Sequence, residues 1–212
     1  MNQQMLFPRL EKLGFDRLDG WEEWIWDKEL EQAMPNIFSL KITKCKLKYF
    51  PPGLVHQTRA LKELIISEAC NLTSVANFLL LSDLHLYANP KLEMLANLPK
   101  LRRLSVIQCP KLNVLMGLTE LQSITLQDYG AELFPQYLEE ISAAKLEVFC
   151  NEELFKLIIL QEGSEWCKIK NIQNVKAYAP KGGDCKGWYA LYTKEPFSLT
   201  TNNKGREIFE IA

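Results

Sequence analysis

The spacing of leucine constrains this chain more than any other feature. The sequence holds 34 leucines among 212 residues, and 18 of them fall between Leu61 and Leu126. The pattern LxxLxLxxNPKLxxL occupies residues 81–95, and LxxLxVxxCPKLxxL occupies residues 101–115. A third copy, LxxLxIxxACNLxxV, occupies residues 61–75. Three consecutive copies in register indicate an internal repeat, which decides the fold class before any other signal.

The repeat extends on both sides of these copies. Weaker copies start at Leu10, Ile37 and Leu121, and a degenerate one ends the series at residues 146–151. The pattern is that of the leucine-rich repeat, in which the central LxL pair lies on a short strand with alternate side chains facing inward. No repeat can bury its own leucines, so each must be covered by its neighbours. We therefore expect an α/β solenoid, a leucine-rich-repeat horseshoe with short parallel strands on its concave face.

One position of the repeat is expected to turn the chain away from each strand. An Asn or Cys side chain there can hydrogen-bond backbone groups that the turn leaves without partners. This position is occupied by Cys45, Ala69, Asn89, Cys109 and Asn151. We therefore assign Cys45 and Cys109 a structural role. No two of the six cysteines have the CxxC spacing typical of metal sites, which favours a reducing compartment.

The repeat pattern predicts two domains. Residues 1–151 form the solenoid of about six to seven irregular repeats, and residues 152–212 form a C-terminal cap. In the cap we expect a short amphipathic helix from Glu152 to Leu160 and an aromatic hairpin. The hairpin strands are predicted at residues 174–178 and 188–192, with a turn at residues 181–184, and the chain from Thr200 onward is expected to fray.

The N-terminal end lacks the polar cap that a solenoid needs. The first repeat begins at Phe7, so the strand Leu13–Phe15 would be a bare edge. We therefore expect the chain to be the C-terminal part of a larger protein or a truncated product. The long first repeat leaves room for a helix or turn in which Trp21, Trp24 and Ile25 share a helical face and pack on the flank of the solenoid.

The outward strand positions form the candidate binding site, because the concave face is the usual binding surface of such solenoids. Ile65, Tyr87 and Ile107 are predicted to lie near one another across three repeats. They would form an apolar hot spot with a charged rim, although single exposed apolar residues are also common on ordinary surfaces. The complete predicted site consists of Lys41, Lys44, Ile65, His85, Tyr87, Arg102, Arg103, Ile107 and Gln127.

The sequence offers little that supports catalysis. It contains no HExxH, GxSxG or phosphate-binding-loop motif, and its two histidines have no acid–nucleophile arrangement around them. We therefore expect no enzyme activity, no cofactor and no metal. The net charge of −1 predicts no nucleic-acid partner, and no apolar run is long enough to span a membrane. Without a signal peptide, we expect the chain in the cytoplasm, with the nucleus as the alternative, and the sequon at Asn71 unglycosylated.

The irregular repeats resemble those of a known family. The motifs CPKL at residues 109–112 and NPKL at 89–92, and the Trp-Glu-Glu-Trp segment at 21–24, are similar to the C-terminal repeats of plant nucleotide-binding leucine-rich-repeat disease-resistance proteins. The aromatic tail at residues 175–193 is similar to the ending of some cereal members. The resemblance covers essentially the whole chain.

This resemblance implies the recognition part of an intracellular plant immune receptor. The repeats of such receptors sense a pathogen effector or a guarded host protein, and they hold the receptor's own nucleotide-binding domain inactive. Each of these three is therefore an expected protein partner. Because this sequence lacks the phosphate-binding loop and the other switch motifs, nucleotide binding does not transfer to it.

Two further functions remain as alternatives. One is a leucine-rich-repeat substrate-recognition adaptor of a ubiquitin-ligase complex, although no ligase-docking motif precedes the repeats. The other is a small-ligand site in the tail that uses Trp188, Tyr189 and Cys185, for which a simple aromatic capping hairpin is the plainer interpretation.

Overall fold

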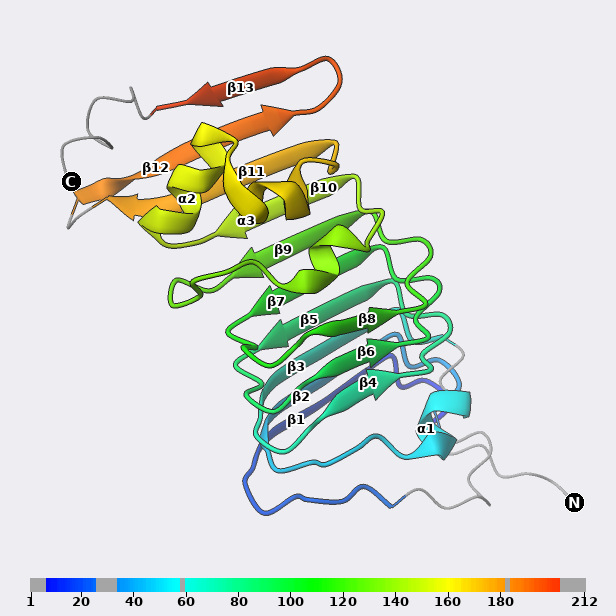
Figure 1. The fold of residues 1–212 in the computed structure, drawn as a ribbon. Coiled ribbons are helices and arrows are strands. Elements are labelled where there is room, and N and C mark those ends of the chain that lie inside the picture. The colour runs from blue at the N-terminus through cyan, green and yellow to red at the C-terminus, as the bar shows by residue number, and fades with distance from the viewer. Residues whose placement is uncertain (1–6, 26–33, 58–59, 182–183, 203–212) are drawn as a thin grey trace, which may run out of the picture. The chain divides into compact units, whose positions relative to one another are not determined.

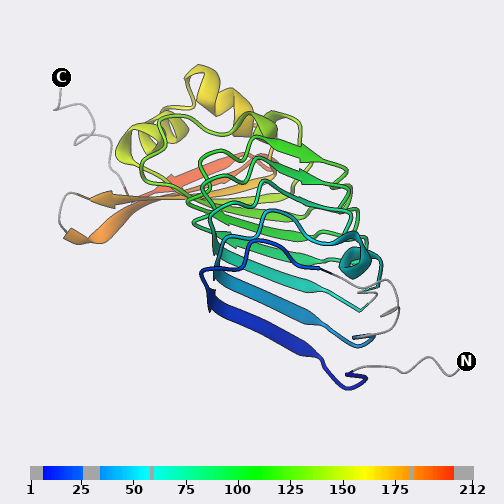
Figure 2. The same ribbon diagram turned by 90° about the horizontal axis from the view of Figure 1, so that it is seen from below.

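The computed structural model describes residues 7–25, 34–57, 60–181 and 184–202, and the chain divides into two compact units, Met1–Glu120 and Leu121–Ala212. Figures 1 and 2 show their secondary structure from two sides. Each unit is described separately below. We call them the first unit and the second unit.

The first unit is built on a sheet of parallel strands, as predicted for a leucine-rich-repeat solenoid. Neighbouring strands pair in strict register, so that Leu40, Leu64, Leu84 and Leu104 lie side by side. These leucines are almost completely buried, because alternate residues of a strand point to the same face. In order, the strands are β1 (Lys12–Leu18), β2 (Ser39–Cys45), β3 (Glu63–Ala69), β5 (Asp83–Tyr87) and β7 (Arg103–Ile107).

A second, smaller sheet covers the other side of the leucine core. Its parallel strands are β4 (Ser74–Ala76), β6 (Met94–Ala96) and β8 (Val114–Met116). Val75 and Leu95 point inward from it and are completely buried. The sequence pattern does not predict these strands, because three residues are too few to display an alternating pattern. The described helix of this unit is α1 (Pro52–Gln57).

Left-handed backbone conformations mark both corners of the repeat. At the ends of the long strands they occur at Arg17, Lys44, Glu68, Ala88 and Gln108, with φ between 50° and 56°. After the short strands they occur at Asn77, Asn97 and Gly117, residue types that tolerate this conformation. The Asn97 amide donates to the Asn77 Oδ1 at 2.8 Å, so these corners stack on one another. A Cβ at residue 117 would lie 3.3 Å from the Asn97 backbone, which explains the glycine there.

Asn89 has the structural role predicted for the position at which the chain turns away from each strand. This residue is completely buried, and its Oδ1 accepts from the Ala69 N–H at 3.0 Å. Its Nδ2 donates to the Ile66 carbonyl at 3.0 Å, one repeat away. Cys45 and Cys109 are buried at the equivalent position. The amide of Asn89 therefore replaces backbone hydrogen bonds that the turn cannot make.

The tryptophan segment differs from the prediction. Residues 21–25 are not helical, so Trp21, Trp24 and Ile25 do not share a helical face. Trp21 and Trp24 instead pack against Phe15 of β1, with ring centroids 4.9 and 5.3 Å away, whereas Ile25 is 87% exposed. The backbone N–H of Trp21 donates to the Leu18 carbonyl at 2.9 Å, so the chain turns directly after β1.

The second unit combines parallel and antiparallel pairing. The first three strands are parallel, and the last two continue the sheet antiparallel. They are β9 (Ser123–Gln127), β10 (Lys145–Phe149), β11 (Asn174–Lys181), β12 (Asp184–Thr193) and β13 (Ser198–Thr201). The predicted hairpin is formed by β11 and β12, and residues 182–183 of its turn lie outside the described residues. Thr200 and Thr201 belong to β13, so the expected fraying does not begin at Thr200, and residues 203–212 lie outside the described part.

Helices cover one face of this sheet. They are η1 (Gln136–Glu139), α2 (Glu152–Leu160) and α3 (Gly163–Ile169), and α2 has the bounds that the sequence predicted. Asn151 starts α2, because its side chain accepts from the Leu154 N–H at 2.9 Å while donating to the Ala131 carbonyl at 2.8 Å. In Figure 1 α2 and α3 lie in front of β10 and β11, and α2 packs on β11 and α3.

A buried ion pair ties α3 to the loop before η1. The Lys168 Nζ lies 2.9 Å from the Glu165 Oε1, and both side chains are at least nine-tenths buried. The Phe134 N–H donates to the Glu165 carboxylate at 2.5 Å, and the Phe134 carbonyl accepts from Lys168 at 2.8 Å. Both charges are therefore hydrogen-bonded to the same backbone residue as well as to each other.

The predicted boundary between residues 151 and 152 stays a prediction based on the repeat pattern. By packing, the chain divides between Glu120 and Leu121, because β9 and β10 continue in register into β11 of the tail. The tail therefore adds strands to the sheet of the last repeats.

Candidate functional site

The outward side of the five-stranded sheet of the first unit carries most of the predicted site. We keep the name concave face for this side. Pairing in register arranges its residues in rows that run across the strands. The three rows are Ser39–Glu63–Asp83–Arg103, Lys41–Ile65–His85–Ser105 and Thr43–Ser67–Tyr87–Ile107.

Tyr87 and Ile107 are direct neighbours on this face. They pair in register on β5 and β7, and Tyr87 is 44% exposed while Ile107 is partly exposed. Neighbouring strands of a sheet lie about 4.7–4.9 Å apart, so these two side chains are close enough to touch. The aromatic ring and the aliphatic side chain therefore form one apolar surface, flanked in the same row by Ser67 and Thr43.

Ile65 lies in a different row from this pair. It is in register with Lys41 and His85, so its contact with Tyr87 can only be diagonal. Lys41 and His85 are exposed, and Ile65 is partly exposed between them. Of the three predicted apolar residues, Tyr87 and Ile107 therefore lie side by side, whereas Ile65 lies in another row.

The first row holds an acidic cluster that sequence reasoning missed. The Arg103 guanidinium donates to Asp83, the residue beside it in register. Asp83 also accepts from the Ser82 hydroxyl at 2.6 Å, and Glu63 accepts from the Ser39 hydroxyl at 2.6 Å. Arg103 and Asp83 are one repeat apart, so the period of 20 residues could have revealed the pair.

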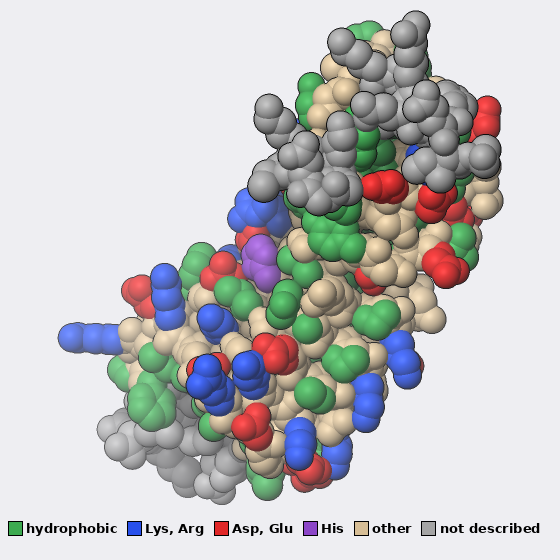
Figure 3. All heavy atoms as spheres, turned by 90° about the vertical axis from the view of Figure 1, so that its left-hand side faces the viewer, with side chains coloured by type: hydrophobic (Ala, Val, Ile, Leu, Met, Phe, Trp, Pro, Cys, Tyr) green, Lys and Arg blue, Asp and Glu red, His purple; other side chains and the backbone are tan. Residues whose placement is uncertain are grey.

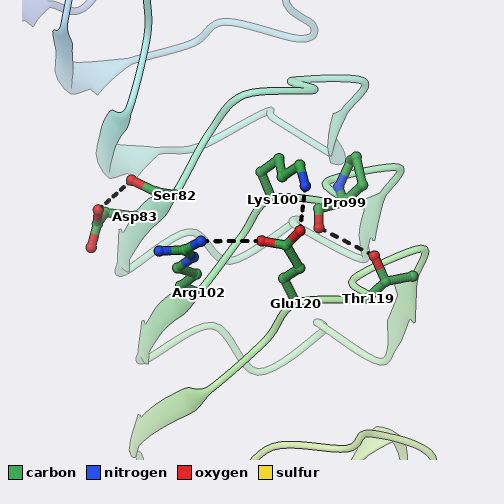
Figure 4. Close-up of polar contacts among 7 residues, drawn as sticks. All are labelled: Ser82, Asp83, Pro99, Lys100, Arg102, Thr119 and Glu120. Atoms are coloured by element: carbon green, nitrogen blue, oxygen red, sulfur yellow. Dashed lines mark hydrogen bonds and ion pairs between the residues drawn. The ribbon is translucent and has the colours of Figure 1, made fainter.

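Arg102 faces away from this row, although it is adjacent to Arg103 in sequence. Its guanidinium lies 3.5 Å from the Glu120 carboxylate, which also accepts from Lys100, as Figure 4 shows. The hydrogen bond from Lys100 is the largest influence that lowers the pKa of the Glu120 carboxyl below its ordinary value, and Arg102 adds to it. Figure 4 also shows the Thr119 hydroxyl donating to the Pro99 carbonyl at 3.2 Å. The turns of these two neighbouring repeats are therefore joined by this hydrogen bond as well as by the contacts of Glu120.

Lys44 is also paired, with Glu68 of the next repeat at 3.8 Å. Three of the four predicted rim cations therefore have carboxylate partners in the first unit. Lys41 forms no ion pair with the residues that the structure describes. Figure 3 shows the resulting mixture on one side of the molecule, where acidic and basic side chains lie beside one another with hydrophobic ones between them.

Gln127, the remaining predicted residue, belongs to the second unit. It is in register with Phe149 of β10, which in turn is in register with Tyr178 of β11. Of the residues named for a ligand site in the tail, Tyr189 is paired with Tyr178 across the hairpin and Trp188 with Ala179. The side chain of Cys185 lies outside the described part of the chain.

Among the described residues, no group of three or more His, Cys, Asp or Glu side chains is placed to hold a metal ion. Burial raises the pKa of the Cys150 thiol to about 12 and, to a smaller extent, raises that of Cys45. As far as the chain is described, no helix is both long and apolar enough to cross a lipid bilayer.

The stacked, in-register strands and the leucine core define a solenoid of the leucine-rich-repeat type. In sequence, 63 residues of the chain are 46% identical to the Arabidopsis thaliana proteins named "Probable disease resistance protein RF45" and "Probable disease resistance protein RDL5". The match covers 29% of this chain and only 6% of the length of either relative. No protein-family model and no solved structure matches the chain.

Proposed function

We propose that this chain is a protein-recognition module whose concave face on the first unit binds the partner. The observation that carries the proposal is the in-register pair Tyr87–Ile107, which places an aromatic and an aliphatic side chain on the outward side of a rigid sheet. Aromatic anchors surrounded by polar residues are typical of interface hot spots.

The paired charges around this surface also suit recognition. The Lys44–Glu68 pair is exposed, and exposed ion pairs stabilise a protein by only about 0–1 kcal/mol. A partner can therefore replace one member of this pair at little cost to the fold. Paired charges of opposite sign select partners by charge pattern instead of attracting any strongly charged molecule.

The finer proposal is recognition within an intracellular plant immune receptor. The partial sequence similarity to two disease-resistance proteins and the motifs CPKL and NPKL support it. The partner would be a pathogen effector, a guarded host protein or the nucleotide-binding domain of the same receptor. The module would act without catalysis, in the cytoplasm or nucleus.

A pull-down from plant tissue tests the site. We expect the double variant Tyr87→Ala/Ile107→Ala to recover at least about tenfold less of a bound partner, because removing hot-spot side chains costs more than about 1.4 kcal/mol. The matched control is Met116→Ala, which removes a 59% exposed side chain from β8 on the opposite sheet. Recovery that is equal for both variants would count against the concave face.

Comparing tissues tests the finer proposal. The tagged chain is expressed in healthy leaves and in leaves exposed to a pathogen. The proposal predicts a partner that is an effector, a host target of an effector, or a receptor domain, and that is lost with the double variant. Recovery of ligase subunits instead would favour a substrate adaptor.

A further inference from the structure

The strand β1 lies at one end of the sheet of the first unit, as Figures 1 and 2 show. In the part of the chain that the structure describes, β2 is the strand that pairs with it. The Ser39 N–H donates to the Glu11 carbonyl at 3.1 Å, and the two strands continue from there in parallel register. Successive residues of a strand direct their backbone groups to opposite edges. The N–H and C=O groups of Lys12, Gly14 and Asp16 therefore face away from β2.

The core side chains of β1 are less well covered than those of β2. Leu13 and Phe15 are partly exposed, whereas their register partners Leu40 and Ile42 are completely buried. The Phe15 ring packs on Trp21 with centroids 4.9 Å apart, and this tryptophan is partly exposed as well. The end of the core is therefore an apolar surface beside a row of outward backbone groups, which is a template for pairing with another strand.

The sequence of β1 is complementary to itself in an antiparallel pair centred on Gly14. In this register Lys12 of one copy lies opposite Asp16 of the other, and Leu13 lies opposite Phe15. Each of these pairs occurs twice, because the two-fold axis passes through Gly14. Opposite charges and apolar side chains at directly opposed positions stabilise an antiparallel pair of strands, whereas like charges destabilise it.

Neighbouring registers lack this complementarity. An axis at Phe15 would oppose the apolar Leu13 to the charged Arg17. An axis at Leu13 would oppose the apolar Phe15 to the charged Glu11. An axis between two residues would turn the core of one copy toward the concave side of the other, because a shift of one residue exchanges the two faces of a strand. The side chains of β1 therefore select the axis at Gly14.

The packing within the chain does not explain why residue 14 is a glycine. A Cβ at this position would meet no described atom within 4 Å. Glycine inside a strand weakens the strand, and it often marks a place where another backbone approaches closely. With the axis at Gly14, the two copies of this residue exchange N–H···O=C hydrogen bonds with each other.

We propose that two copies of this chain associate through β1 as an antiparallel pair centred on Gly14. The sheets of the two first units then form one continuous sheet, with both leucine cores on the same side. Leu13 and Phe15 of each copy cover Phe15 and Leu13 of the other. The contact is isologous, so it uses the outward edge of β1 on both copies and closes at two.

The extent of the contact follows from the backbone of β1. Regular pairing runs from Lys12 to Asp16, because Arg17 leaves the extended conformation with a φ of 56°. The dimer does not depend on the proposed function, since none of the residues predicted for the concave-face site lies on β1. Either proposal can therefore fail without the other.

Sedimentation velocity of the full chain over a range of concentrations tests the dimer. We expect a species with twice the mass of one chain. Lys12→Glu should weaken association at least about tenfold, because both ion pairs of the dimer become pairs of like charge. Asp16→Lys should weaken it equally. The double variant Lys12→Glu/Asp16→Lys should restore the dimer, because both ion pairs form again with reversed sign.

Two further variants make the test specific to β1. Lys111→Glu makes the same change of charge at an exposed lysine outside this strand and should leave association unchanged. Gly14→Pro removes the central N–H donor of the dimer and should abolish association. The monomer should stay folded, because edge strands tolerate proline where the N–H points outward. Thermal melting of each variant checks the fold.

Four results would overturn the inference. One is a chain that stays monomeric at millimolar concentration, which would leave the edge of β1 to a strand of another protein. The second is equal weakening by Lys12→Glu and Lys111→Glu. The third is a double variant that associates no better than the single variants. The fourth is a mass that keeps rising beyond that of two chains, because an isologous contact closes at two.

Discussion

The Asn89 side chain illustrates how single residues hold the repeats together. Its amide is completely buried and joins the Ala69 N–H to the Ile66 carbonyl. Neither backbone group can reach water if the amide is removed. The residue therefore contributes through the groups it satisfies more than through its own volume.

We predict that Asn89→Ala lowers the free energy of unfolding by about 2–4 kcal/mol, because two buried backbone groups lose their partners. Urea denaturation measures the change. The control is Asn71→Ala, whose amide only accepts an exposed hydrogen bond from Lys91, and it should cost less than about 0.5 kcal/mol. Equal losses in both variants would show that the buried bonds of Asn89 are not the cause.

The cysteines should separate by burial. Cys70 and Cys167 are exposed, whereas Cys45, Cys109 and Cys150 are buried. Only the thiolate reacts with alkylating reagents, so we expect rapid labelling of Cys70 and Cys167 at pH 8 and labelling of the other three only after unfolding. Peptide mass mapping distinguishes the sites. Rapid labelling of Cys150 in the folded chain would contradict its burial.

The same thiol predicts a pH dependence. Burial raises the pKa of Cys150 from an ordinary value of 9.0 to about 12 in the folded chain. The folded state therefore keeps a proton that the unfolded state loses above pH 9, and stability should fall as the pH rises from 9 to 12. Replacing Cys150 by Ala should flatten this part of the stability profile, measured by urea denaturation. If the stability of the Cys150→Ala variant fell as steeply with pH as that of the unmodified chain, other ionisable groups would be the cause.

At the scale of elements, the link between α3 and the loop before η1 rests on one buried ion pair. Lys168→Ala should lower the free energy of unfolding by about 3–5 kcal/mol, since it leaves the Glu165 carboxylate buried without its cation. The matched control is Lys156→Ala in α2. It removes the cation of an ion pair that has the same i,i+3 spacing but whose partner, Glu153, is exposed. It should cost less than about 1 kcal/mol.

Elements differed in how far the sequence could predict them. The long strands follow from the LxL pairs, and α2 follows from its amphipathic pattern. The short strands β4, β6 and β8 were missed, because stacking of neighbouring repeats creates them and three residues carry no periodic signal. The left-handed backbone conformations at Lys44, Glu68 and Ala88 were also missed, because nothing in these residue types requires a positive φ.

At the scale of the whole molecule, register decides the site. The sequence placed Tyr87 and Ile107 on one face correctly, because strand alternation and the period of 20 residues fix both. The same period places Ile65 beside His85, in a different row from Tyr87, and Arg103 beside Asp83. The binding of Arg102 to Glu120 instead depends on side-chain positions in three dimensions.

Photo-crosslinking from the concave face tests the central claim most directly. A benzophenone side chain at residue 87 and, separately, at residue 116 reports which surface of the first unit a partner contacts in plant cells. The account predicts a discrete protein crosslink from residue 87 that Ile107→Asp abolishes, and none from residue 116. A crosslink from residue 116 alone, or one from residue 87 that survives Ile107→Asp, would contradict it.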